Sequence, residues 1–148
     1  MNGMRNADFG MRNVQTNKPA NNKPTNQYTI TPMQNNDLKQ RTKQFALRVI
    51  RMTNDLPKTM AAGVLGKQLL RSATSVAANY RSACRGRSKP EFIAKLGIVE
   101  EEADESSFWL ELIEDAAIMP ANRLSALRTE ADEITAIMVS SIRTARQR

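Results

Sequence analysis

Four stripes of apolar and small residues constrain this chain more than any other feature of its sequence. The most regular stripe advances in alternating steps of three and four residues through Phe92, Leu96, Val99, Ala103, Ser106, Leu110, Ile113 and Ala117. Such steps place all members on one side of an α-helix, because a helical turn takes about 3.6 residues. The chain therefore predicts long amphipathic helices, and no stretch shows the sustained alternation typical of a β-strand.

Three further stripes follow the same spacing. The first contains Leu38, Thr42, Phe45, Val49, Met52 and Leu56. The second contains Leu65, Leu69, Ser72, Val76, Asn79 and Ala83. The last contains Leu124, Leu127, Ala131, Ile134, Met138, Ser141 and Ala145.

Turn and cap residues separate the stripes. Pro57, Gly86 and Pro120 lie between successive stripes, where proline and glycine end or interrupt helices. Asp37 is placed to cap the first helix. Ser88 to Glu91 has the pattern of a capping box with a proline in the first turn, which predicts the start of the third helix.

The predicted fold is all-α, an antiparallel up-down-up-down four-helix bundle. Its helices take about 19, 26, 29 and 25 residues, and the short connections make neighbours in sequence neighbours in space. Many stripe positions hold small or polar residues, so the core of one subunit is light. Residues 37–148 form the bundle domain in this interpretation.

Residues 1–36 have a different composition, with nine Asn, four Thr, three Gln and three Pro. So few apolar residues cannot offset the entropy lost on ordering, which predicts a disordered N-terminal tail. An over-extended gene start is the alternative, since Met4, Met11 and Met33 could each begin the protein.

Charge is distributed unevenly along the bundle. Residues 39–90 hold twelve basic residues and one acidic residue, whereas residues 91–117 hold nine acidic and one basic. An antiparallel register centred near residue 87 places Arg71 beside the acidic run of 100–105, which predicts a structural ion pair. The same register leaves a basic cluster around the turn with only Glu91 nearby, and this cluster is the candidate nucleic-acid-binding site: Arg81, Arg85, Arg87 and Lys89.

The sequence argues against most catalytic and metal sites. The chain has no histidine, which excludes Ser-His-Asp and Cys-His nucleophiles and the histidine-containing zinc and di-iron sites. Glu101 and Glu105 share a helical face but lie beside the stripe, so we predict no metal and no other cofactor. Cys84, the single cysteine, lies next to Arg81 and Arg85, which would lower its pKa, although a lone thiol near a helix end is usually inert.

A single cysteine also indicates a reducing compartment, and we expect a cytoplasmic protein. No apolar run approaches the roughly 20 residues needed to span a bilayer, so no membrane partner is expected.

Large apolar residues on the third predicted helix lie off its stripe, on faces that a monomeric bundle leaves in water. These candidates for an oligomer interface are Ile98, Phe108, Trp109 and Leu112. Exposed aromatic residues with aliphatic neighbours are typical of interfaces, so self-association is expected. The alternative is an irregular bundle in which these side chains cover its ends or sides.

Two stretches resemble a known family. The segment from Gln68 to Tyr80, QLLRSATSVAANY, resembles the signature of the four-helix bundle proteins that are also called ribosomal-RNA intervening-sequence proteins. The segment from Arg87 to Leu96 and the run from Glu101 to Glu105 continue the match, which covers about residues 40–146. Many members follow the Asn with Ile-Ala-Glu-Gly, whereas this chain has basic character from Tyr80 to Ala83.

The resemblance implies a ring, typically a homopentamer, without known catalytic activity. The architecture is also similar to that of the accessory proteins of diversity-generating retroelements, basic pentamers that engage a reverse transcriptase and nucleic acid. The functional hypothesis is therefore a non-enzymatic, self-assembling bundle that binds RNA, DNA or a nucleic-acid-processing protein through a basic surface. The alternative is a protein-directed scaffold or adaptor that binds no nucleic acid.

Overall fold

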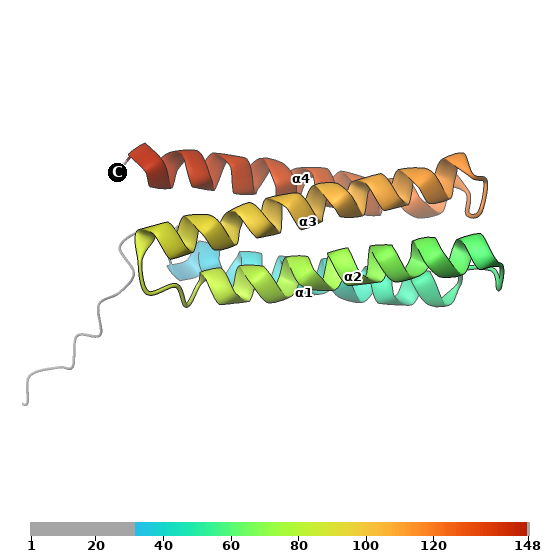
Figure 1. Ribbon diagram of the computed structural model, residues 1–148, viewed down its shortest axis with the longest axis horizontal. Helices are drawn as coiled ribbons and strands as arrows, with labels where there is room; N and C mark the ends of the chain where they lie inside the picture. The colour runs from blue at the N-terminus through green and yellow to red at the C-terminus, as the bar shows by residue number, and fades with distance from the viewer. Residues whose placement is uncertain (1–31, 148) are drawn as a thin grey trace, which may run out of the picture.

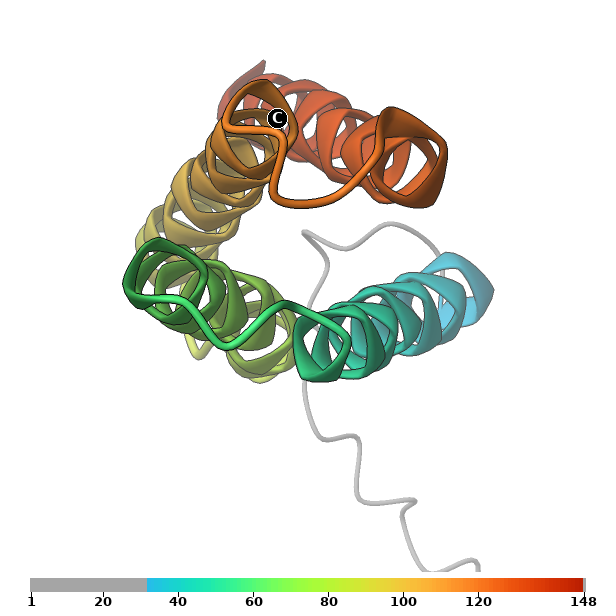
Figure 2. The same cartoon turned by 90° about the vertical axis from the view of Figure 1, so that its right-hand side faces the viewer.

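The computed structural model describes residues 32–147, which form four helices joined by short turns. They are α1 (Pro32–Asn54), α2 (Met60–Ala83), α3 (Lys89–Asp115) and α4 (Ala121–Gln147). Consecutive helices run in opposite directions and lie side by side, as the predicted up-down-up-down bundle requires (Figure 1). The end-on view shows the helices around one core in the order α1, α2, α3, α4 (Figure 2). Both the fold class and the topology are confirmed.

The core follows the predicted stripes closely. The α3 stripe is buried from Phe92 to Ile113, and five members of the α1 stripe are buried between Leu38 and Met52. Apolar side chains from all four helices join in one cluster. Each helix contributes one face to this cluster, which is why the stripes predicted the fold.

Helix α1 begins earlier than predicted. Its first residue is Pro32, so Asp37 lies inside the helix and the predicted cap at Asp37 is wrong. Proline suits the first helical position because its φ is already helical and its missing N–H would have no partner there. The remaining residues of the predicted tail, 1–31, lie outside the described residues.

Three stripe positions differ from prediction. Tyr80, which is 1% exposed, takes the core position expected for Asn79, whose amide instead donates to the Ser75 carbonyl at 3.0 Å. Ile142 is buried in place of Ser141. In each case the two adjacent residues lie on either side of the middle of the buried stripe, about 100° apart around the helix axis. A small rotation of the helix therefore decides which of the two is buried.

The third difference lies at the end of α3. Ala117, expected as the last stripe member, is exposed in the following turn with φ 53°. The N–H of Ala117 donates to the Glu114 carbonyl at 2.8 Å, and that of Ile118 donates to the Ile113 carbonyl at 3.0 Å. This pair of bonds is a Schellman motif, in which the left-handed residue is usually glycine.

The Schellman motif generates a stability prediction. We expect Ala117→Gly to stabilise the protein by about 1 kcal/mol, because glycine removes the steric cost of the left-handed conformation. Ala116→Gly is the matched control, since Ala116 has φ −77° and gains nothing from glycine. Urea unfolding of both variants measures the difference, and an Ala117→Gly protein no more stable than the parent would contradict the motif.

Candidate nucleic-acid interface

The turn between α2 and α3 is tightly built. Helix α2 ends at Ala83 with Cys84 as its C-cap, and the Gly86 N–H donates to the Ala83 carbonyl at 2.9 Å. A Cβ at Gly86 would lie 3.1 Å from the Ala83 carbonyl oxygen and 3.4 Å from the Phe92 backbone. The turn therefore has little room for any residue larger than glycine at this position.

Capping groups hold the other side of the turn. Ser88 is the N-cap of α3, and its hydroxyl accepts the Glu91 N–H at 3.2 Å. The Glu91 carboxylate reaches back and accepts the Arg87 N–H at 2.9 Å. The predicted capping box is therefore present, except that the Glu91 carboxylate accepts the N–H of Arg87, the residue before the N-cap, instead of the N–H of Ser88 itself. A rigid turn thus carries the basic residues.

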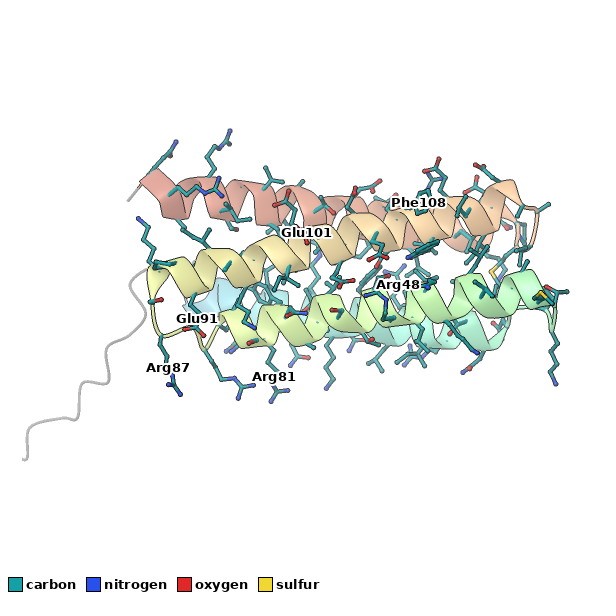
Figure 3. All side chains as sticks on the ribbon, in the orientation of Figure 1. Arg48, Arg81, Arg87, Glu91, Glu101 and Phe108 are labelled. Atoms are coloured by element: carbon teal, nitrogen blue, oxygen red, sulfur yellow. The ribbon has the colours of Figure 1, made fainter. Side chains whose placement is uncertain are left out.

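The basic turn, which we define as Arg81, Arg85, Arg87 and Lys89, presents its charges to solvent. The three arginines are exposed and Lys89 is half-buried at the start of α3. Arg81 and Arg87 extend away from the bundle on the same side of the molecule (Figure 3). Within residues 32–147, none of the four forms an ion pair. All four lie between the last turn of α2 and the first residue of α3.

Arg71 contrasts with the basic turn. Its guanidinium lies 3.3 Å from the Glu102 carboxylate and 2.7 Å from that of Glu105, which confirms the predicted pairing with the acidic run. Glu105 also accepts the Trp109 indole N–H at 3.3 Å. Arg71 is thus committed to an ion-pair network between α2 and α3 that includes two carboxylates.

Sequence reasoning missed a basic residue on α1. Lys39 lies close enough to Cys84 for its charge to oppose the rise in the pKa of that thiol. The C-terminal end of α2 therefore lies beside the N-terminal half of α1, and Lys39 adds to the positive charge there. Only the pairing of α1 with α2 reveals this neighbour, because the two residues are 45 positions apart in the chain.

Burial determines the chemistry of Cys84. Desolvation raises the pKa of the thiol, and its hydrogen bond with the Tyr80 side chain opposes the shift. Burial raises the pKa of Tyr80 as well. The rise in the pKa of Cys84 is opposite to the lowering considered for Arg81 and Arg85, and it agrees with the expectation of an inert thiol.

The four predicted interface residues lie within about 100° of one another around the α3 axis, on the side away from the buried stripe. Phe108 faces solvent and is 49% exposed, and Ile98 is 37% exposed. Trp109 and Leu112 are half-buried, and Trp109 packs against the core cluster. The structure reveals further exposed apolar residues that the stripes did not single out: Ile50, Met60, Val64 and Val139.

The carboxylates of the acidic run of α3 lie in different surroundings. Glu105 pairs with Arg71, and Glu101 is an exposed residue of α3 (Figure 3). The described part of the chain contains no group of three or more metal-ligating side chains.

No helix within residues 32–147 is long and apolar enough to cross a membrane.

Similarity to known proteins agrees with this fold. The family model for 23S rRNA-intervening sequence proteins matches residues 34–140. The chain belongs to this family. Among curated proteins, no sequence matches this chain.

A solved structure supports the family assignment. This is a protein with unknown function from the S23 ribosomal protein family of Bacteroides thetaiotaomicron, which is 32% identical with a TM-score of 0.70. The alignment covers 75% of this chain and 99% of the other. The two proteins therefore share the bundle fold. The similarity assigns no role, so any argument for a role rests on the residues of the basic turn.

The half-buried thiol of Cys84 should react slowly in the folded protein. We expect iodoacetamide to alkylate Cys84 several-fold more slowly in the folded protein than in urea, because burial raises its pKa and limits access. The alkylation rate of the folded protein should also begin to rise at a higher pH than that of the unfolded chain. The reason is that the raised pKa leaves less thiolate in the folded protein at each pH. Mass spectrometry of quenched samples measures both rates, and equal rates would contradict this description of the turn.

Proposed function

We propose that this protein is a non-enzymatic, self-assembling bundle that binds RNA or DNA through the basic turn. The observation that carries the proposal is the contrast between four cations without ion-pair partners among residues 32–147 and Arg71, which has two. Cations that are not neutralised by carboxylates are available to phosphates, and such contacts provide most of the affinity in non-specific binding.

The turn supplies phosphate contacts and no element that reads bases. Three exposed arginines on a short turn can track a sugar–phosphate backbone, but they cannot enter a groove as a recognition helix does. Binding should therefore depend strongly on salt and weakly on nucleotide sequence. This behaviour fits a protein that binds the backbone of an RNA or of a ribonucleoprotein and does not recognise a particular nucleotide sequence.

Self-assembly makes such a turn effective. The exposed and half-buried apolar residues of α3, Ile98, Phe108, Trp109 and Leu112, support an interface between copies. The resemblance to intervening-sequence proteins implies a ring, typically a homopentamer, and we extend this expectation to the present chain. A ring repeats the basic turn once per subunit, so weak individual contacts combine into high avidity.

The proposal requires neither a cofactor nor a membrane and assigns the protein to the cytoplasm. The single cysteine and the absence of histidine from the sequence support a non-catalytic role in a reducing compartment. An acidic protein surface would meet the same cations, which is why the adaptor hypothesis is the alternative that the experiment must distinguish.

The test removes the positive charges of the turn. We expect a variant with alanine at Arg81, Arg85, Arg87 and Lys89 to lose at least tenfold in affinity for a generic RNA at low salt. The logarithmic salt slope for duplex DNA should also fall, by about 0.9 for each phosphate that the protein no longer neutralises. Fluorescence anisotropy at several salt concentrations measures both quantities.

A matched pair of double variants controls for net charge. Arg85→Ala with Arg87→Ala should weaken binding strongly, whereas Lys58→Ala with Lys67→Ala removes the same charge far from the turn and should change little. Arg71→Ala should act on thermal stability instead, because Arg71 pairs with Glu102 and Glu105. Equal effects of the two double variants would reject the turn as the site, and a wild-type protein that binds no nucleic acid would favour the adaptor.

A further inference from the structure

A shallow groove runs between the N-terminal half of α3 and the C-terminal half of α4. Its lining includes four apolar or small residues and two arginines: Ile93, Gly97, Val139, Ile142, Arg143 and Arg146. These helix halves lie together at the end of the bundle that carries the α2–α3 turn (Figure 1). None of these residues belongs to the basic turn, so the groove is a separate surface.

Gly97 leaves the groove floor hollow. A Cβ placed there would meet no atom within 4 Å, so the space above this residue is open. Val139 also lines the groove and is 47% exposed, so an apolar surface borders this open space. The space over Gly97 is therefore open to an apolar side chain that approaches from outside.

The two walls of the groove carry charges of opposite sign. Arg143 and Arg146 follow the α4 wall, and within residues 32–147 neither forms an ion pair. Glu100 and Glu101 follow the α3 wall. A segment that fits would carry a large apolar side chain, with acidic groups on the side that faces Arg143 and Arg146.

Phe108 and its neighbours have this character. Asp104 and Glu111, four residues before and three after, lie on one side of Phe108 around the α3 axis, whereas Leu112 lies on the other. Asp104 has no ion pair in the described part of the chain, and Glu111 has one long contact with Arg128 at 3.6 Å. Asp104 and Glu111 thus make one side of Phe108 acidic, whereas the other side holds Leu112 and Glu105, whose carboxylate is paired with Arg71.

The ring of Phe108 is also held in place. Its centroid lies 5.1 Å from that of Trp109 with the planes tilted by 56°, and Trp109 itself packs against the core. An anchored aromatic ring loses little conformational freedom on binding, which favours a role as an interface anchor. Phe108 is therefore a prepared knob rather than a loose surface side chain.

A chain cannot fill its own groove with its own knob. Gly97 and Phe108 belong to the same straight helix, and eleven residues separate them by about 16 Å along the axis. The geometry points to a second copy of this chain as the occupant: Phe108 of one subunit inserts over Gly97 of the next, with Asp104 and Glu111 facing Arg143 and Arg146. This inference rests on the self-association proposed above and assigns its interface.

Each subunit carries both the knob and the groove at different places. Contacts of this kind repeat from copy to copy and close into a ring when the rotation between subunits allows it. The other residues of the α3 surface, Trp109 and Leu112, would then support the knob or flank it.

Filling the groove gives the first test. We expect Gly97→Leu to shift the protein from oligomer to monomer in light scattering at tens of micromolar, with the melting of the helices retained (a range typical of weak to moderate interfaces). Gly63→Leu is the matched control, because Gly63 also lies in a helix where an added Cβ meets nothing. Phe108→Ala should act like Gly97→Leu, while Met60→Ala, which alters an apolar side chain that is 88% exposed, should leave the oligomer intact.

Exchanging the charges gives the second test. Arg143→Glu with Arg146→Glu, and separately Asp104→Arg with Glu111→Arg, should each weaken assembly at least tenfold. All four changes in one chain should restore it, because the opposite charges face each other again. Restoration distinguishes direct pairing from a general loss of folding, which circular dichroism checks independently.

The outcomes separate this inference from the proposed function. An oligomer that survives both Gly97→Leu and Phe108→Ala overturns the knob-and-groove interface and leaves self-association standing. Charge variants that are not rescued in combination also overturn it. A wild-type chain that is monomeric at these concentrations overturns the interface and the proposed self-association together, and leaves nucleic-acid binding by the basic turn to be judged by its own experiment.

Discussion

The close approach of α2 and α3 fixes much of what the rest of the molecule can do. At its centre, the Ser106 hydroxyl donates to the Ser72 hydroxyl at 2.8 Å, and both residues are fully buried. Ala73 and Ala103 are also fully buried on these helices, so small side chains occupy this layer. Small residues let two helices pack closely, while the hydrogen bond satisfies groups that would otherwise be costly to bury.

This contact sets the register, and the register sorts the charges. One residue before Ser72, Arg71 meets Glu102 and Glu105, which neutralise it. Further along α2, beyond the last acidic partners, the arginines of the basic turn face water. One packing contact therefore explains why some cations stabilise the bundle while others remain available to a polyanion.

The side of the bundle between α1 and α4 is held differently. Arg41 pairs with Glu130 at 2.6 Å and with Glu133, and Arg123 pairs with Asp55 at 2.7 Å. Partly exposed ion pairs of this kind contribute only modestly to the stability of the fold. The core cluster supplies the attraction between α1 and its neighbours, and the ion pairs select the alignment.

The two proposed surfaces use separate parts of α3 and its connections. The basic turn precedes the helix, the groove lies along its first half, and the Phe108 knob lies on its second half. None of the four residues of the basic turn lines the groove, although the turn and the groove lie at the same end of the bundle. The proposed interface and the proposed nucleic-acid site are therefore compatible in one ring, as avid binding requires.

The sequence by itself determined the four helices, their order and most of the core, because stripe spacing and turn residues act locally. It also predicted the capping box at Ser88 and the pairing of Arg71, since one register follows from a short turn. The tertiary structure decided what depends on helix rotation and on neighbours distant in sequence. Tyr80 rather than Asn79 entered the core, Lys39 came beside Cys84, and the hollow over Gly97 opened against Val139. Side-chain packing between helices selects these outcomes, and a single helical pattern does not contain that information.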